Sequence, residues 1–143
     1  MSEWKEFPAT DEAYDDIRDY IVDAAICAGI SEKRILKLEL GVEEVIVNVI
    51  NYAYESPGEI FIQVDYDAEK KEFALTIVDY GVEFNPLKKN DPRAVDKSQI
   101  EDRQLGGFGI AFIKKIFDRL NYERKDFNGK PANYFELIFK TNE

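Results

Sequence analysis

Apolar side chains recur at helical spacing in the first third of the chain. Residues 10–28 and 31–54 each place apolar residues three or four positions apart, a pattern that predicts two consecutive helices. Ala28-Gly29 ends the first helix, and Ser56-Pro57-Gly58 is a clear stop for the second. We therefore expect the N-terminal part of the chain to be a pair of helices.

The remaining hydrophobic pattern is mainly that of strands. Residues 60–66 and 73–78 are rich in β-branched and aromatic side chains and are joined by a short polar turn. A helix is expected from about 107 to 120, and residues 122–126 and 133–139 predict a strand pair around the turn dipeptide Asn128-Gly129. This order of elements predicts an α+β fold, a two-layer α/β sandwich with helices on one face of a mixed, mostly antiparallel sheet.

A polar segment interrupts this pattern from Phe84 to Gln104. It contains Pro86 and Pro92 and has no clear periodicity. About twenty residues without secondary structure inside a compact domain are typical of a functional lid or of a disordered insert. The residues alone leave both interpretations open.

Composition narrows the possible functions. The chain has 143 residues, the length of one domain, which we expect to span 1–143. Its formal net charge of −10 argues against nucleic acid binding, which relies on clustered Lys and Arg. It contains no histidine, which excludes a Ser-His-Asp triad and a phospho-accepting histidine, so any general base would be Asp or Glu. The polar N-terminus and the absence of an apolar stretch of about 18 residues predict a cytoplasmic protein that is not inserted in a membrane.

One stripe of the second predicted helix is polar and includes Glu44, Asn48, Asn51 and Tyr52. A solvated face is one explanation, although asparagine is a poor helix former away from helix ends. The alternative is chemical. The carboxamide oxygen of Asn48 suits Mg²⁺, and Glu44, one turn earlier, can accept a proton from an attacking hydroxyl or water. Glu43 points about 100° away from this stripe and is the poorer base.

Two further segments combine glycine with polar groups. Asp79 ends an apolar strand and lies close to Gly81, which fits a turn as well as a ligand site. Leu105-Gly106-Gly107-Phe108-Gly109 is either a flexible hinge or the N-terminus of a helix, where backbone N–H groups bind phosphate. The nearby Arg103 could contact phosphate or lie in solvent.

In this order, Glu44-Val-Ile-Val-Asn48, Asp79-Tyr-Gly81 and Leu105-Gly-Gly-Phe-Gly109 resemble the ATP site of the GHKL superfamily of ATPases and kinases. Within it the chain is most similar to the anti-sigma-factor serine/threonine kinases, over about residues 7–140. The resemblance implies a Bergerat-type ATP-binding fold with a short first strand within residues 4–9 and an ATP lid at about 85–104. It also implies ATP and Mg²⁺ as cofactors.

The resemblance implies a role for each motif. Glu44 would be the catalytic base, Asn48 the metal ligand, and Asp79 the acceptor for the exocyclic amine of adenine. The remaining expected nucleotide contacts are Asn51, Tyr52, Gly81, Phe84, Arg103, Gly106, Gly107, Gly109 and Asn133. Two positions depart from the family pattern, because Tyr52 stands where histidine is usual and Glu83 stands where a second glycine is usual.

The implied function is phosphorylation of a serine or threonine on a STAS-type anti-sigma-factor antagonist, together with sequestration of a sigma factor. Two alternatives remain: a module that binds nucleotide or a partner without catalysis, and a hydrolase without a protein substrate. The resemblance also implies a homodimer. Trp4, Phe7, Tyr14 and Ile17 give the N-terminus apolar content that would either form the dimer interface or cover the open side of the sheet.

Overall fold

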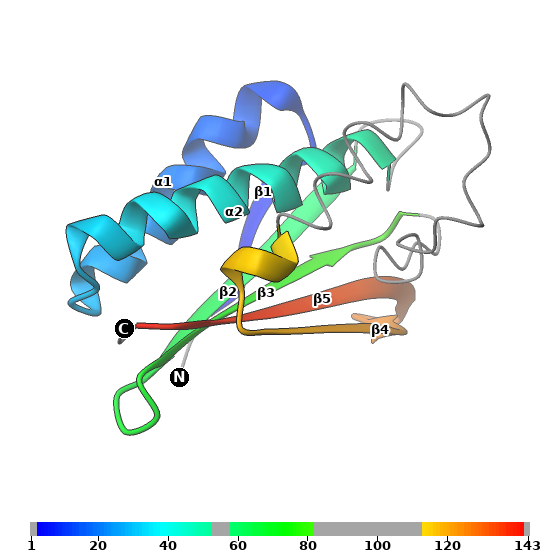
Figure 1. Ribbon diagram of the computed structural model, residues 1–143. Coiled ribbons are helices and arrows are strands. Elements are labelled where there is room, and N and C mark those ends of the chain that lie inside the picture. The colour runs from blue at the N-terminus through cyan, green and yellow to red at the C-terminus, as the bar shows by residue number, and fades with distance from the viewer. Residues whose placement is uncertain (1–2, 53–57, 82–112, 142–143) are drawn as a thin grey trace, which may run out of the picture.

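The computed structural model describes residues 3–52, 58–81 and 113–141, which form two layers (Figure 1). One layer is an antiparallel sheet, and the helices lie together on one of its faces. The elements in chain order are β1 (Lys5–Pro8), the 3₁₀ turn η1 (Asp11–Ala13), α1 (Tyr14–Cys27), α2 (Glu32–Tyr52), β2 (Glu59–Asp67), β3 (Glu72–Asp79), β4 (Arg119–Phe127) and β5 (Lys130–Lys140). Residues 113–116 are also helical. The two-layer α+β fold is therefore confirmed, and every strand pairing among the described residues is antiparallel.

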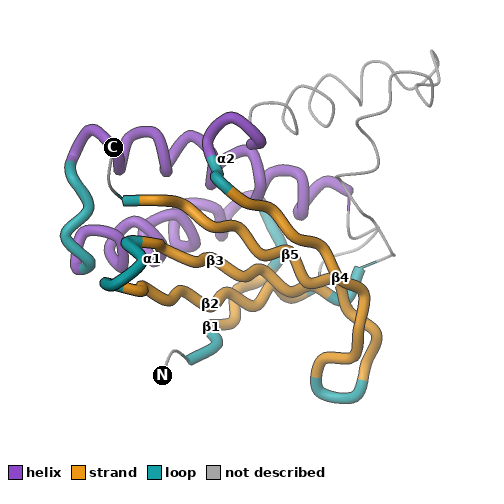
Figure 2. The backbone as a smooth tube through the Cα atoms, turned by 60° about the horizontal axis from the view of Figure 1, so that its bottom comes forward, coloured by secondary structure: helices purple, strands orange, loops and turns teal. Residues whose placement is uncertain are grey.

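The strand order in the sheet is β1-β2-β3-β5-β4 (Figure 2). The next described strand in the sequence, β4, lies at the edge of the sheet, and β5 lies between β4 and β3. The register places Asp79 of β3 opposite Asn133 of β5, and Asn133 opposite Arg124 of β4. Arg124 and Asn133 of the β4–β5 hairpin therefore form one polar row with Asp79, which is distant from them in sequence.

The β4–β5 hairpin has the predicted two-residue turn. Asn128 and Gly129 both have positive φ angles, 53° and 86°, as a type I′ turn requires. This turn fits the right-handed twist of the strands and fixes which residues of β4 and β5 face each other.

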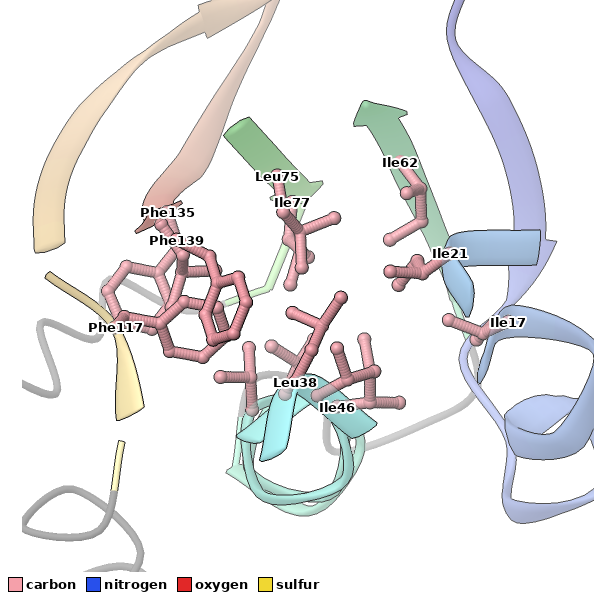
Figure 3. Packing of buried hydrophobic residues seen from close by; sticks show 14 of the residues in the cluster. Ile17, Ile21, Leu38, Ile46, Ile62, Leu75, Ile77, Phe117, Phe135 and Phe139 are labelled. Atoms are coloured by element: carbon pink, nitrogen blue, oxygen red, sulfur yellow. The ribbon is translucent and has the colours of Figure 1, made fainter. Parts of the chain in front are cut away.

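The core lies between the helices and the sheet (Figure 3). Leu38 and Ile46 of α2 point toward Leu75 and Ile77 of β3. At Gly41, α2 approaches the segment after residue 112 so closely that an added Cβ would lie 2.7 Å from Cε2 of the Phe117 ring. The absence of a side chain at this position permits that close contact.

The third predicted helix ends earlier than expected. The prediction extended to residue 120, but the helix ends at residue 116 and β4 begins at Arg119. Asp118 explains the difference, because its N–H donates to the carbonyl of Ile138 and its carboxylate accepts the N–H of Lys140. Pairing with β5 therefore takes up residues whose local pattern also suits a helix.

The apolar residues of the N-terminus belong to the chain's own packing. Phe7 and Ile17 are buried in the core, so the expectation that they form a dimer interface or cover the open side of the sheet was wrong for these two residues. Trp4 lies on the open face of the sheet, with its ring centroid 5.1 Å from that of Phe127 and 6.5 Å from that of Tyr134. Trp4 thus covers the open side of the sheet, as the second explanation predicted. The homodimer stays a prediction. None of the helices in the described ranges is long and apolar enough to cross a membrane.

Candidate functional site

Among the described residues, three polar or charged side chains are buried, and all three belong to the predicted site. Asn48 is 5% exposed, and Asp79 and Asn133 are each 4% exposed. Burial of a polar group costs free energy unless it finds a hydrogen-bond partner. The partners of these three groups therefore define what the site can bind.

Asp79 ends β3, and its Oδ1 atom accepts two hydrogen bonds. The backbone N–H of Gly81 donates at 2.9 Å, and the Nδ2 amide of Asn133 donates at 2.8 Å. Burial raises the pKa of the Asp79 carboxyl, while the bonds from Asn133 and Gly81 and the charge of Arg124 act in the opposite direction. Both of these hydrogen bonds end on Oδ1, which leaves Oδ2 to accept a hydrogen bond from a ligand.

Asn133 is held by β4. Arg124 Nη1 donates to the Asn133 carboxamide oxygen at 3.0 Å, and the Tyr122 hydroxyl donates to the same oxygen at 2.6 Å. Arg124 Nη1 also donates to the Gly81 carbonyl at 2.8 Å. Asn133 is thus both a buried neighbour of Asp79 and the centre of a hydrogen-bonded network.

The sequence interpretation missed Tyr122 and Arg124. A signal was present, because a two-residue turn at Asn128-Gly129 places residue 124 opposite residue 133. Alternation along β4 then directs Tyr122 and Arg124 to the same face of the sheet as Asn133.

Asn48 has one satisfied end and one unsatisfied end. Its Nδ2 donates to the Glu44 carbonyl oxygen at 2.7 Å, one turn earlier in α2. Its Oδ1 is buried and has no hydrogen-bond partner among the described residues. A buried acceptor of this kind needs a donor or a cation, since an unpaired one costs about 1–3 kcal/mol.

Glu44 lies on the same helix face and is partly exposed. Burial, followed by the negative charge of Glu43, raises the pKa of the Glu44 carboxyl above its ordinary value. The direction suits a general base, which works best when its pKa approaches the working pH. Burial, and then the negative charge of Glu43, also raise the pKa of Tyr14 to about 12.

The donor set fits Mg²⁺. A carboxamide oxygen is a hard ligand, and Mg²⁺ usually keeps water and phosphate oxygens as its other ligands. The described ranges contain no cluster of three or more His, Cys, Asp or Glu side chains that could enclose a metal by themselves. Asn48 would therefore be one protein ligand of a metal that arrives with phosphate.

The described part of the site lies at one end of the molecule. The C-terminal end of α2 and the C-terminal end of β3 are on the same side (Figure 1). Phe84, Arg103, Gly106, Gly107 and Gly109 lie outside the described residues, as does the expected lid at about 85–104. Asn51 and Tyr52 belong to the last turn of α2, but their side chains are outside the description. The roles of all these residues stay predictions.

Comparison with known proteins identifies the family of the chain and its fold. A family model for the histidine kinase-like ATPase domain matches residues 7–130. The serine/threonine-protein kinase BtrW of Bordetella bronchiseptica is 25% identical over 89 residues, which cover 62% of this chain and 61% of that protein. The chain thus spans less than two thirds of the length of this relative.

A solved structure has the same fold. The crystal structure of the SiaB–SiaC complex from Pseudomonas aeruginosa matches with a TM-score of 0.64, over 96% of this chain and 88% of that chain. Sequence identity is 11%, so this similarity concerns the fold alone.

Proposed function

The chain belongs to the family of histidine kinase-like ATPase domains, and from this premise we propose that it is an ATP- and Mg²⁺-dependent serine/threonine kinase of the anti-sigma-factor type. The observation that carries the proposal is the set of buried polar groups. Asp79 and Asn133 form a polar row in the sheet, and Asn48 presents an unpaired carboxamide oxygen from α2. A nucleotide with its metal would supply partners for Asp79 Oδ2 and for the Asn48 carboxamide oxygen.

Asp79 would bind the adenine ring. Its Oδ1 is occupied by Gly81 and Asn133, so Oδ2 would accept a hydrogen bond from the exocyclic amine of adenine. Guanine has a carbonyl at that position, and two acceptors facing each other are unfavourable. The buried carboxylate would therefore select adenine.

Glu44 would act in the phosphoryl transfer step. The serine or threonine hydroxyl oxygen of the substrate forms a bond to the γ-phosphorus, the bond from that phosphorus to the bridging β–γ oxygen breaks, and ADP leaves. Glu44 takes the proton of the attacking hydroxyl, for which a raised pKa is favourable. The metal, when bound, neutralises charge on the phosphate oxygens, and the Asn48 oxygen would help to hold it.

The proposed substrate is a protein. The relative from Bordetella bronchiseptica is named a serine/threonine-protein kinase, and the solved structure with the same fold is a complex of two proteins. By the resemblance stated above, the substrate would be a STAS-type anti-sigma-factor antagonist, and the chain would also bind a sigma factor. We further propose that it acts as a cytoplasmic homodimer.

Incubation with γ-labelled ATP, Mg²⁺ and each STAS-type protein encoded in the same genome tests this function. We expect label on a serine or threonine of one such protein, and no label when Mg²⁺ is chelated. Absence of transfer to every candidate, in samples that bind ATP, would refute the kinase proposal.

The second candidate is a module that binds a partner, with or without nucleotide, and regulates that partner by sequestration alone. Glu83 favours it, because a negative charge at a position where the family usually has glycine would weaken phosphate binding. This candidate predicts complex formation with the partner and no phosphoryl transfer, so the same experiment separates the two.

A further inference from the structure

A closed ring of hydrogen bonds surrounds Asp79. Gly81 and Asn133 both donate to Asp79 Oδ1, at 2.9 and 2.8 Å. Arg124 Nη1 donates to the carbonyl of Gly81 and to the carboxamide oxygen of Asn133, at 2.8 and 3.0 Å. A single guanidinium nitrogen thus holds the two residues that hold Asp79.

The chemistry of the ring fixes its direction. Arginine can only donate hydrogen bonds, so the Asn133 atom next to Arg124 must be its oxygen. The amide nitrogen must then face Asp79, and an ionised carboxylate can only accept. Arg124 and Asp79 therefore require the same orientation of the Asn133 amide. The Tyr122 hydroxyl, which donates to the same oxygen at 2.6 Å, stabilises that orientation.

The tertiary structure explains why β4 supplies these groups. Asp79, Asn133 and Arg124 are direct neighbours in register across β3, β5 and β4. Asp79 and Asn133 are buried, and Arg124 is partly exposed at the edge strand, so its charge reaches the site while part of it remains solvated. The arrangement brings a cation near a buried carboxylate without a direct ion pair that would occupy both carboxylate oxygens.

We propose that Arg124, assisted by Tyr122, is a positioning residue that sets the purine specificity of the nucleotide site. It holds Asn133 and Gly81 so that both donate to Asp79 Oδ1, and this directs Oδ2 toward the 6-position of the purine. The inference rests on the proposed function, because it assumes that Asp79 receives adenine. Neither Arg124 nor Tyr122 touches the reacting phosphate in this scheme.

Binding of Mg·ATP and Mg·ITP to the full chain tests the inference. ITP carries a carbonyl where ATP carries the exocyclic amine, so the ratio of the two affinities reports on Oδ2. The variants are Arg124→Met, Arg124→Lys, Tyr122→Phe and the control Arg119→Met. Arg119 lies on the same strand, and its exposed ion pair with Glu72 is outside the ring, so the control removes an arginine from β4 and leaves the ring intact.

We expect Arg124→Met to bind ATP about tenfold more weakly, with little change for ITP, because charge-assisted hydrogen bonds are the stronger ones. Arg124→Lys should keep part of the preference for ATP over ITP, since the lysine ammonium group can still donate to either the Gly81 carbonyl or the Asn133 carboxamide oxygen. Tyr122→Phe keeps the packing of the aromatic side chain and leaves Arg124 in place. We therefore expect the ratio of ATP affinity to ITP affinity to fall only roughly threefold. Arg119→Met should behave like the parent.

Each outcome decides one claim. If Arg124→Met lowers the affinities for ATP and ITP equally, or changes neither, the specificity role is refuted while ATP binding stands. If Arg124→Met does not fold, Tyr122→Phe decides, and a parental ATP to ITP ratio in that variant overturns the inference. If the parent protein does not bind ATP, the proposed function is refuted and the specificity role falls with it.

Discussion

The replacement Asp79→Asn separates ligand binding from stability. In the parent, Asp79 Oδ1 accepts hydrogen bonds from Gly81 and Asn133, and both of these groups are donors. The new carboxamide must keep its oxygen toward them, so its NH₂ group takes the place of Oδ2. A donor then faces the donor amine of adenine.

The magnitude follows from the type of bond that is lost. A hydrogen bond to a charged group contributes about 1.5–3 kcal/mol, which corresponds to a loss of roughly 10- to 150-fold in ATP affinity. The free energy of unfolding should change in the other direction. Burial raises the pKa of the Asp79 carboxyl, so at neutral pH the folded state carries a penalty for ionising it. Asparagine has no such penalty, so stability should be maintained or increased.

The pH dependence has a definite sign. Because the pKa of Asp79 is raised in the folded protein, the folded state binds a proton more readily than the unfolded state does. Protonation of Asp79 therefore stabilises the folded state. This stabilisation is fully present below the pKa that the carboxyl has in the unfolded state, and it is lost as pH rises through the pKa that it has in the folded state. ATP binding has the opposite trend, since it needs the ionised carboxylate and should weaken as pH falls through the raised pKa of Asp79.

Calorimetric titration with Mg·ATP and thermal unfolding measure the two quantities. Asp126→Asn is a suitable control, because Asp126 is an exposed carboxylate on β4 and the substitution changes the net charge equally. Refutation would come from an Asp79→Asn variant that binds ATP as tightly as the control does. Asp79 would then be a turn residue, and the nucleotide would have to bind elsewhere.

Four further predictions concern the site, the packing and the oligomeric state. Glu44→Gln should lower phosphoryl transfer by about 10²–10⁴-fold with ATP affinity largely retained, and equal losses of rate and affinity would contradict a role as base. Asn48→Ala should abolish the increase in nucleotide affinity that Mg²⁺ gives, which titrations with and without the metal can test. Gly41→Ala should lower the free energy of unfolding by about 1 kcal/mol net in urea, because crowding against Phe117 outweighs the gain in helix propensity, and an unchanged or increased value would contradict the close packing. Light scattering at micromolar concentration should give twice the chain mass of 16.5 kDa, and a monomer mass unchanged by nucleotide would exclude the homodimer.

The sequence by itself determined most of the elements and identified the three polar residues that are buried in the described ranges. Periodicity identified both long helices and four strands to within a few residues, because solvent on one face and core on the other impose a regular hydrophobic pattern. Asn128-Gly129 fixed the β4–β5 turn, because two consecutive positive φ angles strongly favour these residue types. The motifs that contain Asn48 and Asp79 were recognisable because their polar residues interrupt apolar patterns.

The tertiary structure decided what local patterns do not encode. Insertion of β5 between β4 and β3 depends on pairing between segments more than fifty residues apart, and that insertion brings Asn133 to Asp79 and Arg124 to both. The helix that was expected to reach residue 120 ends at 116 for the same reason, since pairing with β5 satisfies the backbone there. The sequence also could not predict that Phe7 and Ile17 are buried in the chain's own core, because an apolar residue gives the same sequence pattern whether its own core or a second chain buries it. Hydrophobic periodicity reports which side of an element is buried, and only the packed structure determines what it is buried against.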